Sequence, residues 1–364
     1  MSAHRSPILA LRVGGAATGL AMIGLAAITL SIPAQVEAQS RGPWVMPQTA
    51  DGKPDLQGNW SNATITPIQR PQGQGPVLTP EQVAEIEGTR QEYIDEEAAP
   101  SDPDRDAPPV GGDGSTGAAG GVGGYNYFFI DAGDRVAMVD GEPRSSLITV
   151  PADGRRPGLT EAARARFAER RAFTSQFGQY DNPENRPLAE RCILSFGSNA
   201  GPPMLPNYFY NNNYTIVQTP DHVMIMTEMV HDTRVIRLGE RRPLPEDVAP
   251  WFGDSWGWWE GDTLVVETTN INPDQALQGI PPTPTMKITE RFTRADENTI
   301  NYEFMVEDPA TYEEPWGGQV PFTALPELVY EYACHEGNYA LSNVLSGARA
   351  EEARGSRDQQ QNQR

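Results

Sequence analysis

Two runs of alternating apolar and polar residues lie between Asn211 and Leu238, separated by Thr219-Pro220-Asp221. Alternation with a period of two is typical of a β-strand with one buried face, and the Pro-Asp pair is typical of a turn. The second run also carries a high density of ionisable side chains, namely Glu228, His231, Asp232 and Arg234. This stretch therefore combines predicted core strands with groups that can perform acid–base chemistry.

Further strand-like runs follow one another at close spacing on both sides of this stretch. They lie at 125–131, 135–141, 145–150, 256–260, 263–269, 287–294, 299–307, 319–324 and 328–334. Short strands separated by turn signals predict an antiparallel β-barrel or β-sandwich. Because strands and helices do not alternate along the chain, a parallel sheet is disfavoured. The predicted fold class is therefore mainly β.

Two helices are predicted beside this β-rich region. Thr79-Pro80-Glu81-Gln82 provides an N-cap, a proline at the first helical position and a capping box, which predicts a helix to about Glu96. A second helix is expected over 160–173. The predicted order along the chain is a signal peptide (1–38), an N-terminal arm (39–78), a helix with a disordered acidic, Gly-rich loop (79–124), a single β-rich domain (125–345) and a disordered tail (346–364).

The N-terminus has the pattern of an export signal. Arg5 and Arg12 precede an apolar run over 13–32, and Val36-Glu37-Ala38 offers the small residues that signal peptidase requires. We expect cleavage after Ala38 and a periplasmic or secreted location. The alternative is an uncleaved membrane anchor, because the apolar run is about as long as a membrane-spanning helix.

The net charge limits the kinds of molecule that this chain can bind. The formal net charge of −21 opposes binding to nucleic acid and, after signal cleavage, to anionic membrane surfaces. A small-molecule ligand is the expected partner, and the oligomeric state is left open.

Cys192 and Cys334 are the two cysteines, and in an oxidising compartment we expect them to form one disulfide. A Cys nucleophile is the alternative.

Strand parity places two carboxylates among apolar side chains. Glu290 shares its face with Ile288, and Glu228 shares its face with Met226. An apolar environment disfavours the charged carboxylate and raises its pKa toward that of a general acid. The alternative is an internal ion pair, between Glu290 and an arginine of a neighbouring strand or between Glu228 and Arg234.

The candidate catalytic groups are two histidines as base and two glutamates as acid: His231, His335, Glu228 and Glu290. In a straight strand Glu228 shares a face with Asp232 and Arg234. His231 then points to the opposite face, unless a bulge or turn lies near Val230. The conformation at Val230 therefore decides whether Glu228 and His231 can act together.

An irregular segment would also allow a metal site. The side chains that would form it are His231, His335, Glu228 and Glu336. Two histidines with carboxylates suit iron, zinc or manganese, although the spacing matches no established metal motif. A divalent metal ion is thus the candidate cofactor.

A G-x-S-x-G motif does not occur in the sequence, which disfavours a serine hydrolase.

Aromatic side chains accompany these acids after the central stretch. Aromatic rings near acids can bind sugars or aromatic ligands, and packing in the core is the alternative. The candidate ligand-binding residues are Arg234, Trp256, Trp258 and Tyr332.

Two resemblances bear on the fold. The sequence Gly58-Asn59-Trp60 is similar to the Gly-x-Trp signature in the first strand of lipocalin-like barrels. Longer segments, among them GGYNYFFID from Gly123 and GDSWGWWEGDTLVVETTN from Gly253, resemble a widespread family of exported bacterial proteins. This second resemblance implies export and a single β-rich domain, and it attaches no activity, cofactor or catalytic residue.

Three functions are compatible with these observations. The first is an exported enzyme that uses acid–base chemistry, of hydrolase or lyase type, on a carbohydrate-like or aromatic ligand in a β-barrel cavity. The second is a periplasmic ligand carrier without catalysis. The third is a structural envelope protein that works through its acidic surface.

The export signal is directly testable. When the full chain is expressed in a bacterium that exports it, N-terminal sequencing of the product should begin at Gln39, because cleavage is expected after Ala38. A product that begins at Met1 and sediments with the membrane fraction would favour the anchor instead.

Overall fold

The computed structural model describes residues 44–100, 104, 129–195, 201–206, 209, 211–245 and 247–362. The predicted signal peptide at 1–38 lies outside the described residues, as does most of the predicted acidic, Gly-rich loop. No helix in the described part of the chain has an apolar run long enough to cross a membrane.

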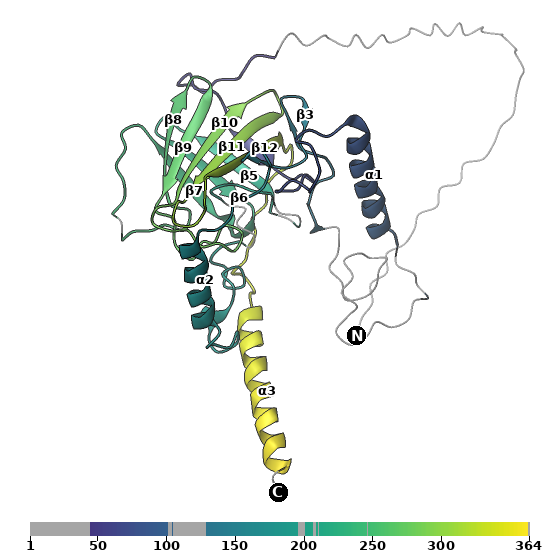
Figure 1. Cartoon of the computed structure of the whole chain (residues 1–364), viewed down its shortest axis with the longest axis vertical. Helices are drawn as coiled ribbons and strands as arrows, with labels where there is room; N and C mark the ends of the chain where they lie inside the picture. Colours follow the sequence, from purple (N-terminus) through teal and green to yellow (C-terminus); the bar gives the residue numbers. More distant parts are fainter. Residues whose placement is uncertain are drawn as a thin grey trace, which may run out of the picture. The chain divides into compact units, whose positions relative to one another are not determined.

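Nine strands close into a barrel, which confirms the predicted mainly β fold class (Figure 1). The strands in ring order are β1 (Gly58–Ser61), β5 (Asn213–Gln218), β6 (His222–Thr227), β7 (Thr233–Leu238), β8 (Asp254–Glu260), β9 (Thr263–Thr269), β10 (Lys287–Arg294), β11 (Thr299–Glu307) and β12 (Trp316–Ala324). The ring closes because β12 pairs with β1. A tenth strand, β4 (Ile148–Val150), pairs with β12 outside the ring, and β2 (Met138–Val139) and β3 (Glu142–Pro143) form a separate hairpin.

The junction between β7 and β8 is parallel, whereas every other junction of the ring is antiparallel. Strand directions can alternate all round a ring only if the number of strands is even, so a ring of nine needs a parallel junction. The parallel pairing is short, joining Arg237 to Trp256 and Leu238 to Gly257. We call this junction the seam. The loop 239–253 connects its two strands.

Large side chains fill the barrel interior. Those that are almost completely buried include Trp60, Tyr214, Phe292, Tyr302, Trp316 and Phe322. The alternation seen in the sequence is regular in β11, where buried and partly exposed residues follow one another along the whole strand. This is the expected arrangement for a barrel of about this size, in which side chains occupy the interior.

An ion pair crosses the interior between β7 and β10. Arg234 Nη1 lies 2.5 Å from Glu290 Oε2 and Arg234 Nη2 lies 3.0 Å from Glu290 Oε1. Tyr302 donates to Glu290 Oε1 over 2.8 Å, and the Met204 amide donates to the Tyr302 hydroxyl over 2.9 Å. Glu290 is 0% and Arg234 3% exposed. The predicted alternative of an internal ion pair thus holds for Glu290, although its partner lies across the barrel and not on a neighbouring strand.

The N-terminal arm has a larger role than predicted, because it supplies β1. Trp60 is buried in the barrel, and the Arg294 guanidinium lies 5.1 Å from the centre of its ring. The lipocalin-like Gly-x-Trp segment is therefore a barrel strand. The barrel differs from the eight-stranded up-and-down barrels of lipocalins in its ninth strand and its parallel seam.

The predicted strand at 328–334 is wrong. Both edges of β12, the strand that precedes this segment, are already occupied, one by β11 and the other by β1 and β4. The segment runs over the surface instead, with Leu328 71% and Tyr330 75% exposed.

Three helices accompany the barrel: α1 (Pro80–Glu97), α2 (Glu161–Thr174) and α3 (Ala340–Asn362). The first begins with the predicted capping box, in which Thr79 and Gln82 bond reciprocally. The prediction of a disordered tail is wrong, because α3 continues through most of it. Its Ala, Glu, Arg and Gln are strong helix formers, and Arg349 anchors the helix by donating to the Tyr180 carbonyl over 2.8 Å.

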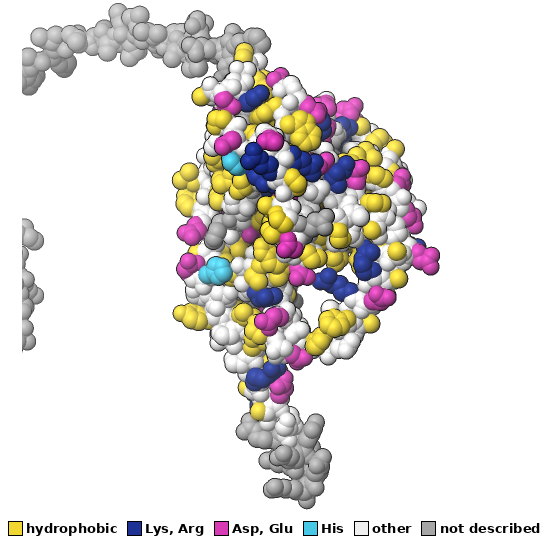
Figure 2. Space-filling view, turned by 90° about the vertical axis from the view of Figure 1, so that its left-hand side faces the viewer, with side chains coloured by type: hydrophobic (Ala, Val, Ile, Leu, Met, Phe, Trp, Pro, Cys, Tyr) yellow, Lys and Arg dark blue, Asp and Glu magenta, His cyan; other side chains and the backbone are white. Residues whose placement is uncertain are grey.

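Lysine and arginine side chains offset part of the negative surface charge locally. On the face shown in Figure 2, Lys and Arg side chains gather with Asp and Glu side chains beside them. Ion pairs on the outside of the barrel include Lys287 with Glu307 at 2.7 Å and Arg291 with Glu260 at 2.9 Å.

The buried ion pair predicts a specific pattern of stability. Glu290→Leu leaves the Arg234 charge buried without its counter-ion, which should cost about 3–5 kcal/mol of unfolding free energy. The double variant Arg234→Met/Glu290→Leu removes both charges and should recover part of that loss. Urea unfolding measures all three proteins.

The exposed pair offers the matched control. Arg291→Met should change stability little, because an exposed ion pair contributes weakly. A double variant that is less stable than Glu290→Leu would contradict this account of the interior.

Candidate functional site

The turn between β6 and β7 carries Glu228. Strand β6 ends at Thr227, and a 3-10 turn, η4 (Met229–His231), follows. Within it Val230 adopts φ 59° and ψ 9°, a left-handed conformation that costs a β-branched residue roughly 1–3 kcal/mol. The chain is therefore irregular at Val230. The expectation that Glu228, Asp232 and Arg234 share the face of one straight strand is wrong for Glu228, because this turn separates it from Asp232 and β7.

Hydrogen bonds from neighbouring segments hold this turn in place. Asn211 Oδ1 accepts from the Met229 amide over 2.7 Å, and the Asn213 carbonyl accepts from the Glu228 amide over 3.1 Å. Asp232 Oδ2 accepts from the Ser195 amide over 3.0 Å. These bonds offset the strain and fix the position of the Glu228 side chain at the end of the barrel where β5 begins and β6 ends, which we call the barrel mouth.

A second carboxyl group, that of Asp131, lies at the barrel mouth. Asn213 Nδ2 donates to Glu228 Oε2 over 3.1 Å, and both Asn213 and the charge of Asp131 influence the pKa of Glu228. The backbone of Asp131 is held by Asn212, whose Nδ2 donates to its carbonyl over 2.6 Å, and by the Phe209 carbonyl, which accepts from its amide over 2.7 Å. We call Glu228, Asp131 and Asn213 the acid cluster.

Both carboxyl groups of the acid cluster have raised pKa values. Burial raises the pKa of Glu228, the hydrogen bond from Asn213 opposes this effect, and the charge of Asp131 adds to it. Burial likewise raises the pKa of Asp131, with Asn213 opposing and the charge of Asp134 adding. A raised pKa brings a carboxyl group closer to the range in which it can act as a general acid.

The other predicted catalytic groups lie elsewhere. Glu290 is sealed in the ion pair with Arg234, and both of its oxygens accept hydrogen bonds, so it is not available as a general acid. His335 is exposed on the surface segment before α3. The backbone of His231 belongs to η4, and its side chain lies outside the described part of the structure. The expected convergence of two histidines and two glutamates is therefore wrong for Glu290, whereas the role of the exposed His335 stays a prediction.

The described residues also bear on the predicted metal site. Glu336 is exposed and lines a surface pocket beside the disulfide, away from the acid cluster on β5 and η4. Among the side chains that the structure describes, no three His, Cys, Asp or Glu groups come together in a way that would hold a metal ion.

The four predicted ligand-binding residues do not form one site. Arg234 belongs to the buried ion pair, and Trp256 packs under the guanidinium of Arg237 at 4.5 Å. Trp258 is 40% exposed on the outside of β8, where it donates to Glu260 over 2.9 Å. Tyr332 lines the surface pocket next to Cys334.

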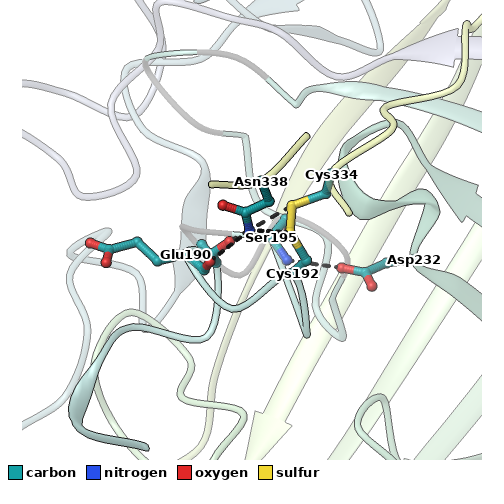
Figure 3. The surroundings of a disulfide bond; sticks show 7 residues. Glu190, Cys192, Ser195, Asp232, Cys334 and Asn338 are labelled. Atoms are coloured by element: carbon teal, nitrogen blue, oxygen red, sulfur yellow. Dashed lines mark hydrogen bonds between the residues drawn. A yellow bond between two sulfur atoms is a disulfide. The ribbon is translucent and has the colours of Figure 1, made fainter. Parts of the chain in front are cut away.

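The predicted disulfide joins Cys192 to Cys334, and no described cysteine is free. Figure 3 shows Asn338 on one side of it, donating to Cys192 Sγ over 3.1 Å, and the Ser195–Asp232 hydrogen bond on the other. The disulfide thus fastens the C-terminal segment to a loop that in turn holds the barrel-mouth turn. A disulfide is typical of exported proteins.

No family model, curated protein or solved structure matches this chain. The function of the acid cluster is therefore argued from its geometry.

Two parts of the acid cluster were missing from the sequence-based predictions. Asp131 was assigned to the end of a strand, and Asn213 to the start of one. The run Asn211-Asn212-Asn213 was the available signal, since three consecutive amides before an apolar strand are poor strand formers. Each of the three side chains bonds a different part of the barrel mouth.

The raised pKa of Glu228 predicts a pH-dependent contribution to stability. The native state binds more protons than the unfolded state between the ordinary and the raised pKa, so this contribution is present at acidic pH and lost as pH rises through the native pKa. Because a glutamine side chain does not titrate, the Glu228→Gln variant does not lose this contribution as the pH rises. Relative to wild type, the variant should gain stability as pH rises from about 4 to about 8.

Urea midpoints at a series of pH values measure this difference. Glu314→Gln, the same change at an exposed carboxyl, is the control. A constant difference between Glu228→Gln and wild type across the series would contradict the proposed environment of Glu228.

Proposed function

We propose that this chain is an exported enzyme that performs acid–base chemistry, of hydrolase or lyase type, on a small carbohydrate-like or aromatic ligand. Glu228 and Asp131 would act as the acid and base, and a ligand would bind at the barrel mouth. The observation that carries the proposal is the pair of partly buried carboxyl groups of Glu228 and Asp131, both with raised pKa values, of which Glu228 is held by a hydrogen bond from Asn213.

The energetic cost of this arrangement supports catalysis over simple binding. Burial opposes the charged forms of both Glu228 and Asp131, and the charge of Asp131 further opposes that of Glu228. The adjacent Val230 is held in a strained conformation. Perturbed carboxyl groups and strained backbone occur together most often where chemistry takes place. His231, whose backbone lies in the same turn, is the further candidate for the base.

The ligand is expected at the mouth and not in the middle of the barrel. The described interior is occupied by aromatic side chains and by the Arg234–Glu290 pair. We therefore no longer expect a ligand cavity inside the barrel. Such a cavity would need an interior lined by smaller side chains.

Turnover by the mature chain from Gln39 tests the proposal. The substrates are panels of 4-nitrophenyl glycosides and 4-nitrophenyl esters, and release of nitrophenolate is the measurement. For a substrate that is turned over, Glu228→Gln and Asp131→Asn should each lower kcat/KM by about 10²–10⁴-fold, the usual contribution of a positioned acid or base.

Glu314→Gln is the matched control and should leave kcat/KM unchanged, because this carboxyl is exposed on another part of the chain. Removing either member of the acid cluster should also remove one limb of the pH–rate profile. Turnover that survives both substitutions would sink the proposed roles. Binding of a glycoside without product formation would favour the ligand carrier.

A further inference from the structure

The two cysteines of the disulfide differ in exposure. Cys192 is 4% exposed, whereas Cys334 is half-buried and lines a surface pocket of about 340 Å³. Cys334 Sγ lies 3.9 Å from the carbonyl oxygen of Ala189, which is also part of the pocket wall. A thiolate in this pocket therefore lies next to Cys334, while Cys192 lies behind it in the protein.

The buried sulfur has a hydrogen-bond donor beside it. Asn338 Nδ2 donates to Cys192 Sγ over 3.1 Å, and the same nitrogen donates to the Glu190 carbonyl over 3.1 Å (Figure 3). A thiolate accepts hydrogen bonds more strongly than a disulfide sulfur does, because it carries a negative charge. Asn338 is thus placed to stabilise Cys192 as the leaving thiolate when Cys334 is attacked.

The backbone at Cys192 is held in an unfavourable conformation. Its φ is 53°, in the left-handed region that residues other than glycine rarely adopt. Two restraints act on this residue, namely its bond to Cys334 and the hydrogen bond from its amide to the Ala189 carbonyl over 3.2 Å. Opening the disulfide removes the first restraint and allows the residue to relax. Strained or exposed disulfides are the ones that exchange readily.

The segment after β12 is fastened by this disulfide. Residues 325–339 lie within the described part of the chain, form no helix or strand, and have mostly exposed side chains. Before the disulfide, the Leu325 amide donates to the Asn59 carbonyl over 2.8 Å. After it, Arg349 of α3 donates to the Tyr180 carbonyl over 2.8 Å. The disulfide is the covalent attachment between these two points.

On its other side the disulfide is connected to the barrel mouth. Cys192 lies in the same loop as Ser195, whose amide donates to Asp232 Oδ2 over 3.0 Å. Asp232 closes the turn η4, because its carbonyl accepts from the Thr227 amide over 2.8 Å. A change in the position of Cys192 therefore reaches the turn that carries Glu228.

We propose that the Cys192–Cys334 disulfide is an exchange site for a dithiol, and that its opening frees the segment 325–339 and loosens η4. One thiolate of the dithiol attacks Cys334 Sγ and forms a mixed disulfide. The bond to Cys192 Sγ breaks, and Cys192 leaves as a thiolate that takes a proton from water. The second thiolate of the dithiol then attacks its own sulfur in the mixed disulfide and releases Cys334. The dithiol is oxidised to its cyclic disulfide, and the protein disulfide is reduced to two thiols.

Trapping with a monothiol tests which sulfur is attacked. The folded, oxidised mature chain is treated with reduced glutathione, which has no second thiol to complete the exchange. Free thiols are then alkylated, and the peptides are mapped by mass spectrometry. We expect most of the glutathione on Cys334 and the alkyl group on Cys192, because access decides the site of attack. Glutathione mainly on Cys192, or no adduct while the chain stays folded, would overturn the proposal.

Asn338→Asp tests the stabilisation of the leaving thiolate. The change replaces a donor with a carboxylate that repels a thiolate, so dithiothreitol should reduce the disulfide about 3–10-fold more slowly. Asn343→Asp makes the same change at an exposed position in the first turn of α3 and should leave the rate unchanged. Reduction of Asn338→Asp as fast as this control would exclude the role of Asn338.

Hydrogen–deuterium exchange before and after treatment with dithiothreitol tests the structural consequence. We expect faster exchange in 189–195, η4 and α3, with β9–β11 unchanged. Faster exchange in β9–β11 as well would show that the disulfide only stabilises the whole fold. Unchanged exchange in η4 would exclude the connection to Glu228.

The double variant Cys192→Ser/Cys334→Ser is the control for the reagent. It should exchange like the reduced wild type and should not respond to dithiothreitol, because no described cysteine lies outside this disulfide. A response of the double variant would assign the effect to something other than the disulfide. These measurements follow thiols and amide protons and not turnover, so the inference goes beyond the proposed enzymatic function and stands or fails independently of it.

Discussion

The closure of nine strands into one ring is the constraint on which the rest of the structure depends. Nine strands cannot alternate in direction at every junction, and the fold places the unavoidable parallel junction between β7 and β8. A parallel junction cannot be made with a tight hairpin, so the chain needs the loop 239–253 to return to the start of β8. A pocket of about 520 Å³ lies beside this short pairing, lined by residues of both strands and of the loop.

The buried ion pair connects this seam to the core. Arg234 lies on β7 at the seam, and Glu290 lies on β10 on the far side of β8 and β9. Desolvating both charges is costly, and a packed apolar pair would serve stability as well or better. The bidentate contact instead fixes one orientation of β7 against β10, and the Tyr302 hydroxyl extends the network to the Met204 backbone. We interpret the pair as a device that specifies the register of the barrel near its parallel junction.

The barrel mouth is organised by different means. Hydrogen bonds from amide side chains, not apolar packing, set the positions of Glu228 and Asp131. The disulfide contributes indirectly, because it anchors the loop whose Ser195 amide bonds Asp232. A rigid rim of this kind can hold carboxyl groups in an environment that disfavours their charged forms, because several backbone hydrogen bonds offset the energetic cost.

The sequence alone determined the features that depend on local pattern. Alternation predicted most of the barrel strands, the Thr79–Gln82 capping box predicted the start of α1, and the two cysteines predicted their own pairing. Only the tertiary structure decided which groups meet. Arg234 and Glu290 are 56 positions apart in sequence, and periodicity states the face on which each lies but not the distance across a closed ring. The same is true of β1, which closes the ring by pairing with β5 and β12, and of Asp131, which lies close enough to Glu228 for its charge to raise the pKa of Glu228. Local pattern fixes the direction of each side chain, whereas ring closure fixes its neighbours.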